Sequence, residues 1–246
     1  MQALILSAGL GTRLKPLTDS LPKVMLPIGG KPLLEHHLEQ FRKHGVEEFL
    51  INLHHLPEKI TEYFGDGSKW GVKIIYKYEP EILGTAGGIK NFENEIKDDF
   101  FVVYGDMLTS VDYSKFYEYH QTKTKDFCIG VILIALPGHF CSHPYDSDLG
   151  ILDKNMRIVS ILSKPHKDLP SSYCTLEALY IFNREIFKYI PKGTYCEIDH
   201  NLLPEVIKKE AIYGYPLQGR DYIRDIGTVE RYKQAQEDLK EIFRNF

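Results

Sequence analysis

Cysteine is scarce in this sequence, and no two cysteines stand close enough to form a CxxC pair. The four cysteines are Cys128, Cys141, Cys174 and Cys196. They are too few for a disulfide scaffold, so we expect a reduced, cytoplasmic protein. No run of about 18 apolar residues occurs, which argues against a transmembrane helix. The apolar start of the chain is short and follows no positively charged region, so we expect no signal peptide.

An excess of positive charge is also lacking. Lysine and arginine number 30 against 34 aspartates and glutamates, a net charge of −4, whereas dedicated nucleic-acid binders are usually basic. Linkers, repeats and low-complexity tracts are absent. The 246 residues are 43% hydrophobic and 26% charged, which is ordinary for a globular protein. We therefore expect one domain over residues 1–246, with neither nucleic acid nor a membrane as partner.

Strand-like and helix-like segments alternate through the first half of the chain. Apolar, β-rich segments predict strands at 3–6, 49–53, 73–78, 100–104 and 127–135. Helical spacing of apolar residues predicts helices at 32–44, 57–64, 86–96 and 114–121. Such alternation is typical of βαβ units. It predicts an α/β fold with a mainly parallel, mixed sheet and helices on both faces.

The pattern changes after residue 135. An irregular segment is followed by predicted strands at 150–152, 158–162, 176–182 and 222–225. Predicted helices follow at 205–209 and 228–243. The simplest interpretation is one α/β domain whose second half carries an elaboration on the substrate side.

A glycine-rich loop follows the first predicted strand. Gly9 and Gly11 permit positive φ angles and let backbone N–H groups approach an anion closely. Two cations, Arg13 and Lys23, stand in the same loop. The arginine offers a rigid fork for a polyphosphate and the lysine a compact point charge. From spacing alone, both a phosphate-binding loop and a solvated basic loop remain open.

Two known nucleotide-binding fingerprints do not fit this loop. A dinucleotide fingerprint requires a glycine at position 14, which is Leu14, and an uninterrupted helix, which Pro16 breaks. A P-loop ending at Lys31 requires a glycine and then a serine or threonine where Met25 and Pro32 stand. The sequence therefore disfavours an NAD-dependent dehydrogenase.

The loop as a whole resembles the signature of the sugar-1-phosphate nucleotidyltransferases. The matching segments are 9–13, 16–18, 22–23 and 30–32. The resemblance implies a three-layer, Rossmann-like fold and catalytic roles for Arg13 and Lys23, which would stabilise charge as pyrophosphate leaves. It implies nucleotide binding by Leu6, Ala8, Gly9, Gly11, Thr12, Arg13 and Lys23.

Three further segments extend the resemblance on the nucleotide side. Segment 83–87 resembles the part of the family that lies against the base, which implies nucleotide contacts at Gly84 and Thr85. Asp106 and Asp225 stand where the family has magnesium-binding aspartates, and Asp106 is also implied in catalysis and nucleotide binding. By themselves, the segment that ends at Asp106 is also typical of a turn, and the segment that begins at Asp225 is also typical of a helix N-terminus. Mg²⁺ prefers hard oxygen ligands, and carboxylates at strand ends can converge, so we expect Mg²⁺ as cofactor.

The sugar side matches the family less completely. Lys164 is retained where the family's lysine grips the phosphate of the sugar 1-phosphate, but Ser163 replaces the preceding glutamate. Gly150 stands where backbone touches the sugar. Glu177 falls at a position that is often asparagine, and it is either the acceptor that Ser163 lacks or a solvated charge on a strand. The implied substrate-binding residues are Gly150, Ser163, Lys164, Glu177 and Asp225.

The resemblance implies transfer of a nucleoside monophosphate from a nucleoside triphosphate to a sugar 1-phosphate. Segment 81–87 resembles most the short guanylyltransferases acting on mannose- or heptose-type sugar phosphates, so we expect GTP. UTP-, CTP- and dTTP-dependent relatives share most of the pattern, and a non-catalytic, nucleotide-sugar-binding regulatory homologue is the second class.

The resemblance also implies that the two halves of the chain bind different substrates. We expect a nucleotide-binding half over about 1–135 and a sugar-phosphate-binding half, with the last helix, over about 136–246. Because the sequence ends after that helix, we expect neither acyl transfer nor regulation by an added β-helix. The assembly that we consider is a homodimer.

Overall fold

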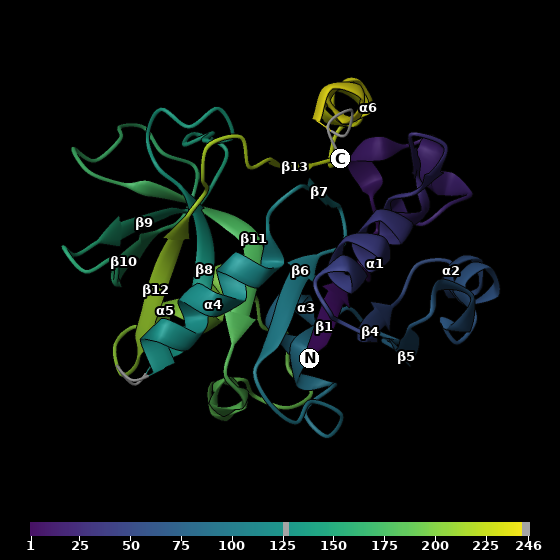
Figure 1. The fold of residues 1–246 in the computed structure, drawn as a ribbon, viewed down its shortest axis with the longest axis horizontal. Coiled ribbons are helices and arrows are strands. Elements are labelled where there is room, and N and C mark those ends of the chain that lie inside the picture. Colours follow the sequence, from purple (N-terminus) through teal and green to yellow (C-terminus); the bar gives the residue numbers. More distant parts are fainter. Residues whose placement is uncertain (125–127, 243–246) are drawn as a thin grey trace. The chain divides into compact units, whose positions relative to one another are not determined.

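The computed structural model describes residues 1–124 and 128–242, which form two compact units interleaved along the chain (Figure 1). Unit 1 contains Met1–Ile82, Val103–Ser110 and the described residues from Tyr222 onward. Unit 2 contains Leu83–Val102 and Val111–Asp221. The first strand, purple in Figure 1, and the last helix, yellow, thus belong to the same unit.

Unit 1 is built on four strands that are neighbours in the sheet. They are β1 (Gln2–Leu6), β4 (Glu48–Leu53), β5 (Lys73–Tyr78) and the end of β6 (Phe100–Tyr104). Strand β4 lies between β1 and β5 and pairs in parallel with both, with Leu50 opposite Leu4 and Ile75. The end of β6 lies on the other side of β1. Residues on both faces of β1 are buried, as expected for parallel strands that are covered on both sides.

Three helices belong to unit 1, namely α1 (Leu33–Lys43), α2 (Pro57–Phe64) and α6 (Val229–Ile242). The predicted apolar face of α1 is fully buried, and Phe41 packs edge-to-face on Phe49. Gly45, at φ 80°, follows the end of α1, which is the left-handed position that favours glycine. Pro57 occupies the first turn of α2, where its missing N–H costs no hydrogen bond.

Short elements complete unit 1. The strands are β2 (Pro27–Ile28), β3 (Lys31–Pro32), β7 (Met107–Thr109) and β13 (Ile223–Asp225). Single 3₁₀ turns occur at Thr12–Leu14, Leu17–Asp19, Lys23–Met25 and Ser68–Trp70. Strands β7 and β13 pair antiparallel, although they lie far apart in the sequence.

Unit 2 contains mainly antiparallel strands. They are β8 (Cys128–Ala135), β9 (Leu149–Leu152), β10 (Ile158–Leu162), β11 (Cys174–Phe182) and β12 (Ala211–Pro216). Strand β11 pairs antiparallel with β8 and β9, and β9 pairs antiparallel with β10. Only β12, on β8, adds a parallel pair among these strands of the described chain.

Apart from α4, the helices described in unit 2 are short. They are α3 (Gly84–Lys90), α4 (Tyr113–Lys123), α5 (Leu203–Val206), a 3₁₀ helix at Arg184–Tyr189 and a π-helix at Ile198–Leu202. Among the described residues, no helix combines the length and the apolar character needed to cross a bilayer.

The predicted α/β class and mixed sheet are confirmed, while several boundaries differ. The helix predicted at 86–96 ends at Lys90 and continues as turns, with the Phe92 N–H bonded to the Ile89 carbonyl. The helix predicted at 205–209 lies earlier, at Leu203–Val206. Residues 127 and 243, at the ends of two predicted elements, lie outside the described residues. The single domain and its division near residue 135 stay predictions.

Candidate active site

Gly11 gives the first loop its shape. Its φ of 63° is left-handed, and an added Cβ would lie 2.8 Å from the Thr18 methyl. The Thr18 hydroxyl also donates a 2.8 Å hydrogen bond to the Gly11 carbonyl. Gly11 therefore adopts the positive φ angle that glycine permits. Gly9 does not have a positive φ angle, and nothing lies within 4 Å of a Cβ placed on it.

Four charged side chains predicted from sequence gather in unit 1. Lys23 forms an ion pair with Asp106. A Cβ placed on Gly227 would lie 2.6 Å from Asp225 Oδ1, 3.0 Å from Arg13 Nη2 and 3.5 Å from Lys23 Nζ. One carboxylate and two cations thus lie around Gly227, and the second carboxylate, Asp106, is joined to them through its ion pair with Lys23.

Pairing of the short strands β7 and β13 brings the two aspartates to neighbouring positions. Asp106 immediately precedes β7, and Asp225 is the last residue of β13, opposite Met107. The Ile226 N–H donates a 2.9 Å hydrogen bond to the Asp106 carbonyl. The backbone ladder therefore fixes the spacing between the two acidic residues.

Gly105 lets the chain pass closely beside the first loop. A Cβ at this position would lie 2.8 Å from Val24, 2.9 Å from the Leu6 carbonyl and 3.0 Å from the Ser7 hydroxyl. The Gly105 N–H donates to the same Leu6 carbonyl at 2.8 Å. A larger residue at 105 would push Asp106 away from the loop.

The Asp225 carboxylate is held from two sides. Oδ1 accepts a 2.8 Å hydrogen bond from the Gly227 N–H. Oδ2 accepts a 2.6 Å hydrogen bond from the Arg231 guanidinium, in the first turns of α6, and the two groups form an ion pair. Both side chains are less than one-third exposed, so the pair is partly shielded from solvent. Sequence reasoning missed Arg231, and the available signal was a cation in the helix that follows Asp225.

The donor set at Asp106 and Asp225 fits Mg²⁺. Both residues supply hard carboxylate oxygens from neighbouring chain segments, and Mg²⁺ uses one or two carboxylates with phosphates and water. Within residues 1–124 and 128–242, no group of three or more His, Cys, Asp or Glu side chains forms a protein-only metal cage. The arrangement therefore suits a metal shared with a phosphorylated ligand.

Gly84 and Thr85 are anchored inside unit 2. Gly84 has φ 75°, and a Cβ there would lie 2.6 Å from the Cys196 carbonyl oxygen. The Thr85 hydroxyl donates to Glu197 at 2.7 Å and accepts the Ile198 N–H at 2.7 Å. The start of α3 is therefore held against residues 196–198, and the Thr85 side chain is used in this attachment.

Lys164 and Ser163 each contact a residue that sequence reasoning missed. The Lys164 N–H donates to Asp148 Oδ1 at 2.9 Å, and its Nζ donates to the Asp146 carbonyl at 3.1 Å. The Ser163 hydroxyl lies 3.1 Å from His200 Nδ1. Asp148 immediately precedes β9, and His200 lies in the π-helix. The spacing of residues in the sequence marked neither of them as a site residue.

The two remaining sugar-side predictions have different outcomes. A Cβ on Gly150 would lie 2.9 Å from both Cys174 and Leu176, so close packing requires this glycine. Glu177 is only 8% exposed and accepts a 2.9 Å hydrogen bond from the Thr175 hydroxyl. The alternative of a solvated charge on a strand is therefore wrong for Glu177.

The predicted residues are thus divided between the units. Unit 1 holds Leu6, Ala8, Gly9, Gly11, Thr12, Arg13, Lys23, Asp106 and Asp225. Unit 2 holds Gly84, Thr85, Gly150, Ser163, Lys164 and Glu177. Within unit 1, the structure brings together all four charged residues that the sequence singled out there.

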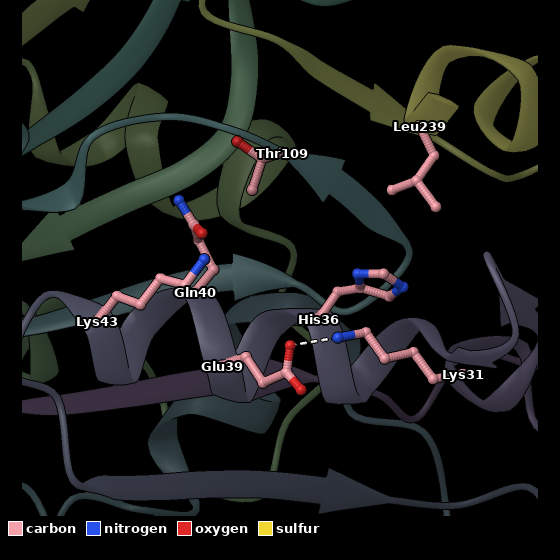
Figure 2. A pocket seen from close by; sticks show the side chains of 7 residues that line it. All are labelled: Lys31, His36, Glu39, Gln40, Lys43, Thr109 and Leu239. Atoms are coloured by element: carbon pink, nitrogen blue, oxygen red, sulfur yellow. Dashed lines mark hydrogen bonds and ion pairs between the residues drawn. The ribbon is translucent and has the colours of Figure 1, made fainter. Parts of the chain in front are cut away.

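A cavity of about 250 Å³ in unit 1 involves none of these residues. Its lining is Lys31, His36, Glu39, Gln40, Lys43, Thr109 and Leu239. Figure 2 shows the ion pair between Lys31 and Glu39 along α1, with Thr109 and Leu239 facing the helix. The charged side chains around Gly227, and not this cavity, therefore mark the candidate site.

Comparison with known sequences matches the chain to the family model described as Nucleotidyl transferase over residues 2–242. A UTP–glucose-1-phosphate uridylyltransferase of Synechocystis is 34% identical, and a mannose-1-phosphate guanylyltransferase of Mycobacterium tuberculosis is 32% identical. These matches cover 96% and 97% of this chain, but only 62% and 64% of those relatives. An N-acetylmuramate α-1-phosphate uridylyltransferase of Neisseria meningitidis is 33% identical, with 96% of this chain and 97% of the relative covered.

Solved structures agree with these matches. A putative glucose-1-phosphate thymidylyltransferase of Bacillus anthracis, in complex with sucrose, has a TM-score of 0.83 at 20% identity and shows the fold. That match covers 96% of this chain and 94% of the other. HddC of Yersinia pseudotuberculosis, in complex with GMP-PN, has a TM-score of 0.77 at 26% identity, with 97% and 99% covered. The expected fold is confirmed, and the chain belongs to the nucleotidyl transferase family.

Proposed function

We propose that this protein transfers a nucleoside monophosphate from a nucleoside triphosphate to a sugar 1-phosphate and releases pyrophosphate. The gathering of Arg13, Lys23 and Asp225 around Gly227, with Asp106 paired to Lys23, carries this proposal. Two fixed cations suit a polyphosphate, and two carboxylates suit its divalent counter-ion. All three curated relatives reported above have names that describe this class of transfer.

In the proposed reaction, a phosphate oxygen of the sugar 1-phosphate attacks the α-phosphorus in line. The new P–O bond forms as the bond to pyrophosphate breaks, and the electron pair leaves with pyrophosphate. The attacking phosphate is already ionised near neutral pH, so no general base is required. Positioning and charge stabilisation therefore supply most of the rate enhancement.

The side chains have separate tasks in this reaction. Arg13 and Lys23 stabilise the negative charge that builds on the departing pyrophosphate. Asp106 and Asp225 would hold Mg²⁺, which when bound neutralises phosphate oxygens. Lys164 receives the phosphate of the sugar. Its Nζ donates a hydrogen bond to the Asp146 carbonyl, and among the described residues no carboxylate pairs with its charge, which suits an anion.

For the substrates, we propose GTP with a mannose- or heptose-type sugar 1-phosphate. The guanylyltransferase of M. tuberculosis and the GMP-PN complex of HddC support this choice, as does the resemblance of segment 81–87. Uridylyl transfer is the second candidate, since the N. meningitidis relative matches over nearly its whole length. A homodimer and a cytoplasmic location stay predictions.

Release of pyrophosphate from a panel of triphosphates and sugar 1-phosphates tests the proposal. We expect one pair, GTP with a mannose- or heptose-type phosphate, to be preferred, with loss of turnover in EDTA and recovery with Mg²⁺. Preference for UTP would favour the second candidate. Binding of a nucleotide-sugar without turnover of any pair would contradict catalysis and indicate a regulatory homologue.

A further inference from the structure

The end of β4 contacts the first loop of unit 1 at two points. Asn52, near the end of this strand, accepts the Ser7 N–H at 2.6 Å through its side-chain Oδ1. His55 follows the strand, and its Nε2 lies 2.9 Å from the Thr18 carbonyl oxygen. All four residues belong to unit 1. One short segment, 52–55, therefore holds both the start of the loop and a point eleven residues further along it.

The Asn52 amide is fixed at both of its ends. Its Nδ2 donates to Glu79 Oε1 at 2.9 Å, and a carboxylate oxygen accepts, so Oδ1 is the atom that faces Ser7. Asn52 is 2% exposed, and Glu79 and Ser7 are buried as well. Ser7 directly follows β1 and Glu79 directly follows β5. The buried amide therefore ties together the ends of three neighbouring strands at the point where the first loop begins.

The contact at His55 continues to the left-handed glycine of the loop. A carbonyl oxygen only accepts, so His55 Nε2 carries the hydrogen that it shares with Thr18. The Thr18 hydroxyl in turn donates to the Gly11 carbonyl at 2.8 Å. Thr18 is 1% exposed, so packing also restrains it. Two hydrogen bonds in series thus connect His55 with Gly11.

The backbone between these two points has N–H groups that are not used inside the protein. Among the residues that the structure describes, none accepts a hydrogen bond from the N–H groups of residues 8–13. Consecutive N–H groups of this kind suit an anion. Two glycines in the segment permit many backbone conformations, so restraint at both sides reduces the entropy that a bound anion would have to remove.

We infer that Asn52 and His55 are positioning residues, which hold the first loop in the shape that presents its N–H groups to the phosphates of the triphosphate. This inference rests on the proposed function and deepens it. Neither side chain is required to touch the substrate. Asn52 acts through Ser7, and His55 acts through Thr18 and Gly11.

The central test compares His55→Leu with His55→Gln. Leucine has no donor, and loss of one neutral hydrogen bond predicts a KM for the triphosphate about fivefold higher. Glutamine places an amide N–H near the Nε2 position and should restore most of the wild-type KM. The KM for the sugar 1-phosphate should be unchanged in both variants. Calorimetric titration with GTP, without a sugar phosphate, should show the same changes in Kd.

Thr18→Val tests whether His55 acts through Thr18. Valine keeps the size of the side chain but does not donate to Gly11, so we expect about the same rise in the KM for the triphosphate. Since the two hydrogen bonds act in series, the double variant His55→Leu/Thr18→Val should be little worse than either single one. Tyr63→Phe removes an exposed hydrogen bond to Glu35 in the same unit and, as the control, should match wild type.

Asn52→Ala tests the other point of attachment. It removes the acceptor of the Ser7 N–H and one donor to Glu79, so we expect a KM for the triphosphate at least fivefold higher, again with an unchanged KM for the sugar 1-phosphate. Urea unfolding shows whether this variant is folded. If it is not, the two His55 variants decide the inference.

The outcomes separate this inference from the proposed function. An active wild type with an unchanged KM for the triphosphate in His55→Leu would overturn the inference and leave the proposed function standing. Equal penalties in His55→Leu and His55→Gln would also overturn it, because the hydrogen bond would then contribute nothing. A wild type that binds GTP but turns over no pair of the panel contradicts the proposed function, and the Kd values then decide the inference. A wild type that neither binds nor turns over a triphosphate overturns both.

Discussion

Gly227 lies against three charged side chains of unit 1, those of Asp225, Arg13 and Lys23. The Asp225 carboxylate and the Arg13 guanidinium both lie within 3.0 Å of its Cβ position, where there is no room for a methyl group. We expect Gly227→Ala to displace these groups and to lower kcat/KM about 100-fold, the loss typical of a 1 Å misplacement. Steady-state pyrophosphate release measures the effect. An unfolding midpoint close to wild type, with activity retained, would contradict the packing described here.

Lys23 should act mainly on the chemical step. Lys23→Ala removes one group that stabilises charge, so we expect kcat to fall by about two to three decades. Lys15→Ala, an exposed lysine in the same loop that pairs with Asp19, is the matched control. Single-turnover measurements with saturating substrates check the prediction. A kcat equal to that of the control would leave Lys23 with a structural role only.

Asp106 should be needed for metal-dependent turnover and not for folding. Asp106→Asn keeps the size of the side chain but removes the charge, so we expect loss of Mg²⁺-dependent activity with an unchanged circular dichroism spectrum. Activity is measured across a range of Mg²⁺ concentrations. Turnover at wild-type rates, with a wild-type Mg²⁺ dependence, would exclude Asp106 from the metal site.

At the residue scale, motif spacing identified the charged residues but not the residues that position them. Arg13, Lys23 and Asp106 stand in segments whose local sequence resembles the family. Arg231 and Asp148 take part through contacts made by distant segments of the chain. No periodicity or short motif marks such a contact. The burial of Glu177 was likewise undetermined, because a strand position alone does not reveal what covers it.

The start of α3 depends on one close approach between main chains. The Gly84 Cβ position lies 2.6 Å from the Cys196 carbonyl oxygen, and the N–H groups of Ala86 and Gly87 donate to that same oxygen. We expect Gly84→Ala to lower the free energy of unfolding by about 2 kcal/mol or more, from strain at positive φ and the clash together. Urea denaturation measures this loss.

Gly45→Ala is the matched control for this prediction. Gly45 also has a positive φ, 80°, but nothing lies within 4 Å of its Cβ position. Gly45→Ala should therefore lower the free energy of unfolding only by the cost of the left-handed backbone, about 1 kcal/mol. Equal losses in the two variants would show that the contact with Cys196 contributes nothing.

At the element scale, apolar runs with clear ends were predicted well. The bounds predicted for α2, β5, β6 and β10 agree with the structure. Strand β12 was not predicted, since Gly214 and Pro216 weaken its β pattern. Strand β13 agrees with the strand predicted at 222–225, but its three-residue partner β7 was not predicted, because so short a segment carries too little local signal. These two strands nevertheless position both aspartates.

The molecule as a whole should lose stability in mild acid because of His37. This side chain is 2% exposed, and burial lowers its pKa from 6.5 to about 4. Below about pH 6.5 the unfolded chain binds a proton that the folded chain does not, so stability is lost as the pH falls toward 4. The free energy of unfolding should fall by about 2 kcal/mol between pH 7 and pH 5 from this group.

Urea unfolding of wild type and His37→Asn at the two pH values measures this contribution. The asparagine does not titrate, so the variant should show a smaller change between pH 7 and pH 5, and the difference between the two proteins isolates His37. The same pH dependence in both proteins would contradict the assignment.

The interleaving of the two units has a consequence for synthesis. Unit 1 contains the first strand but also the residues from Tyr222 onward, with β13 and α6. A growing polypeptide is made from its N-terminus, so β7 has no partner strand until residues 223–225, more than 110 residues further along, have left the ribosome. A nascent chain that ends before residue 225 lacks Asp225, and with it one of the two carboxylates of the proposed metal site. That site therefore becomes complete only after residue 225 has been made.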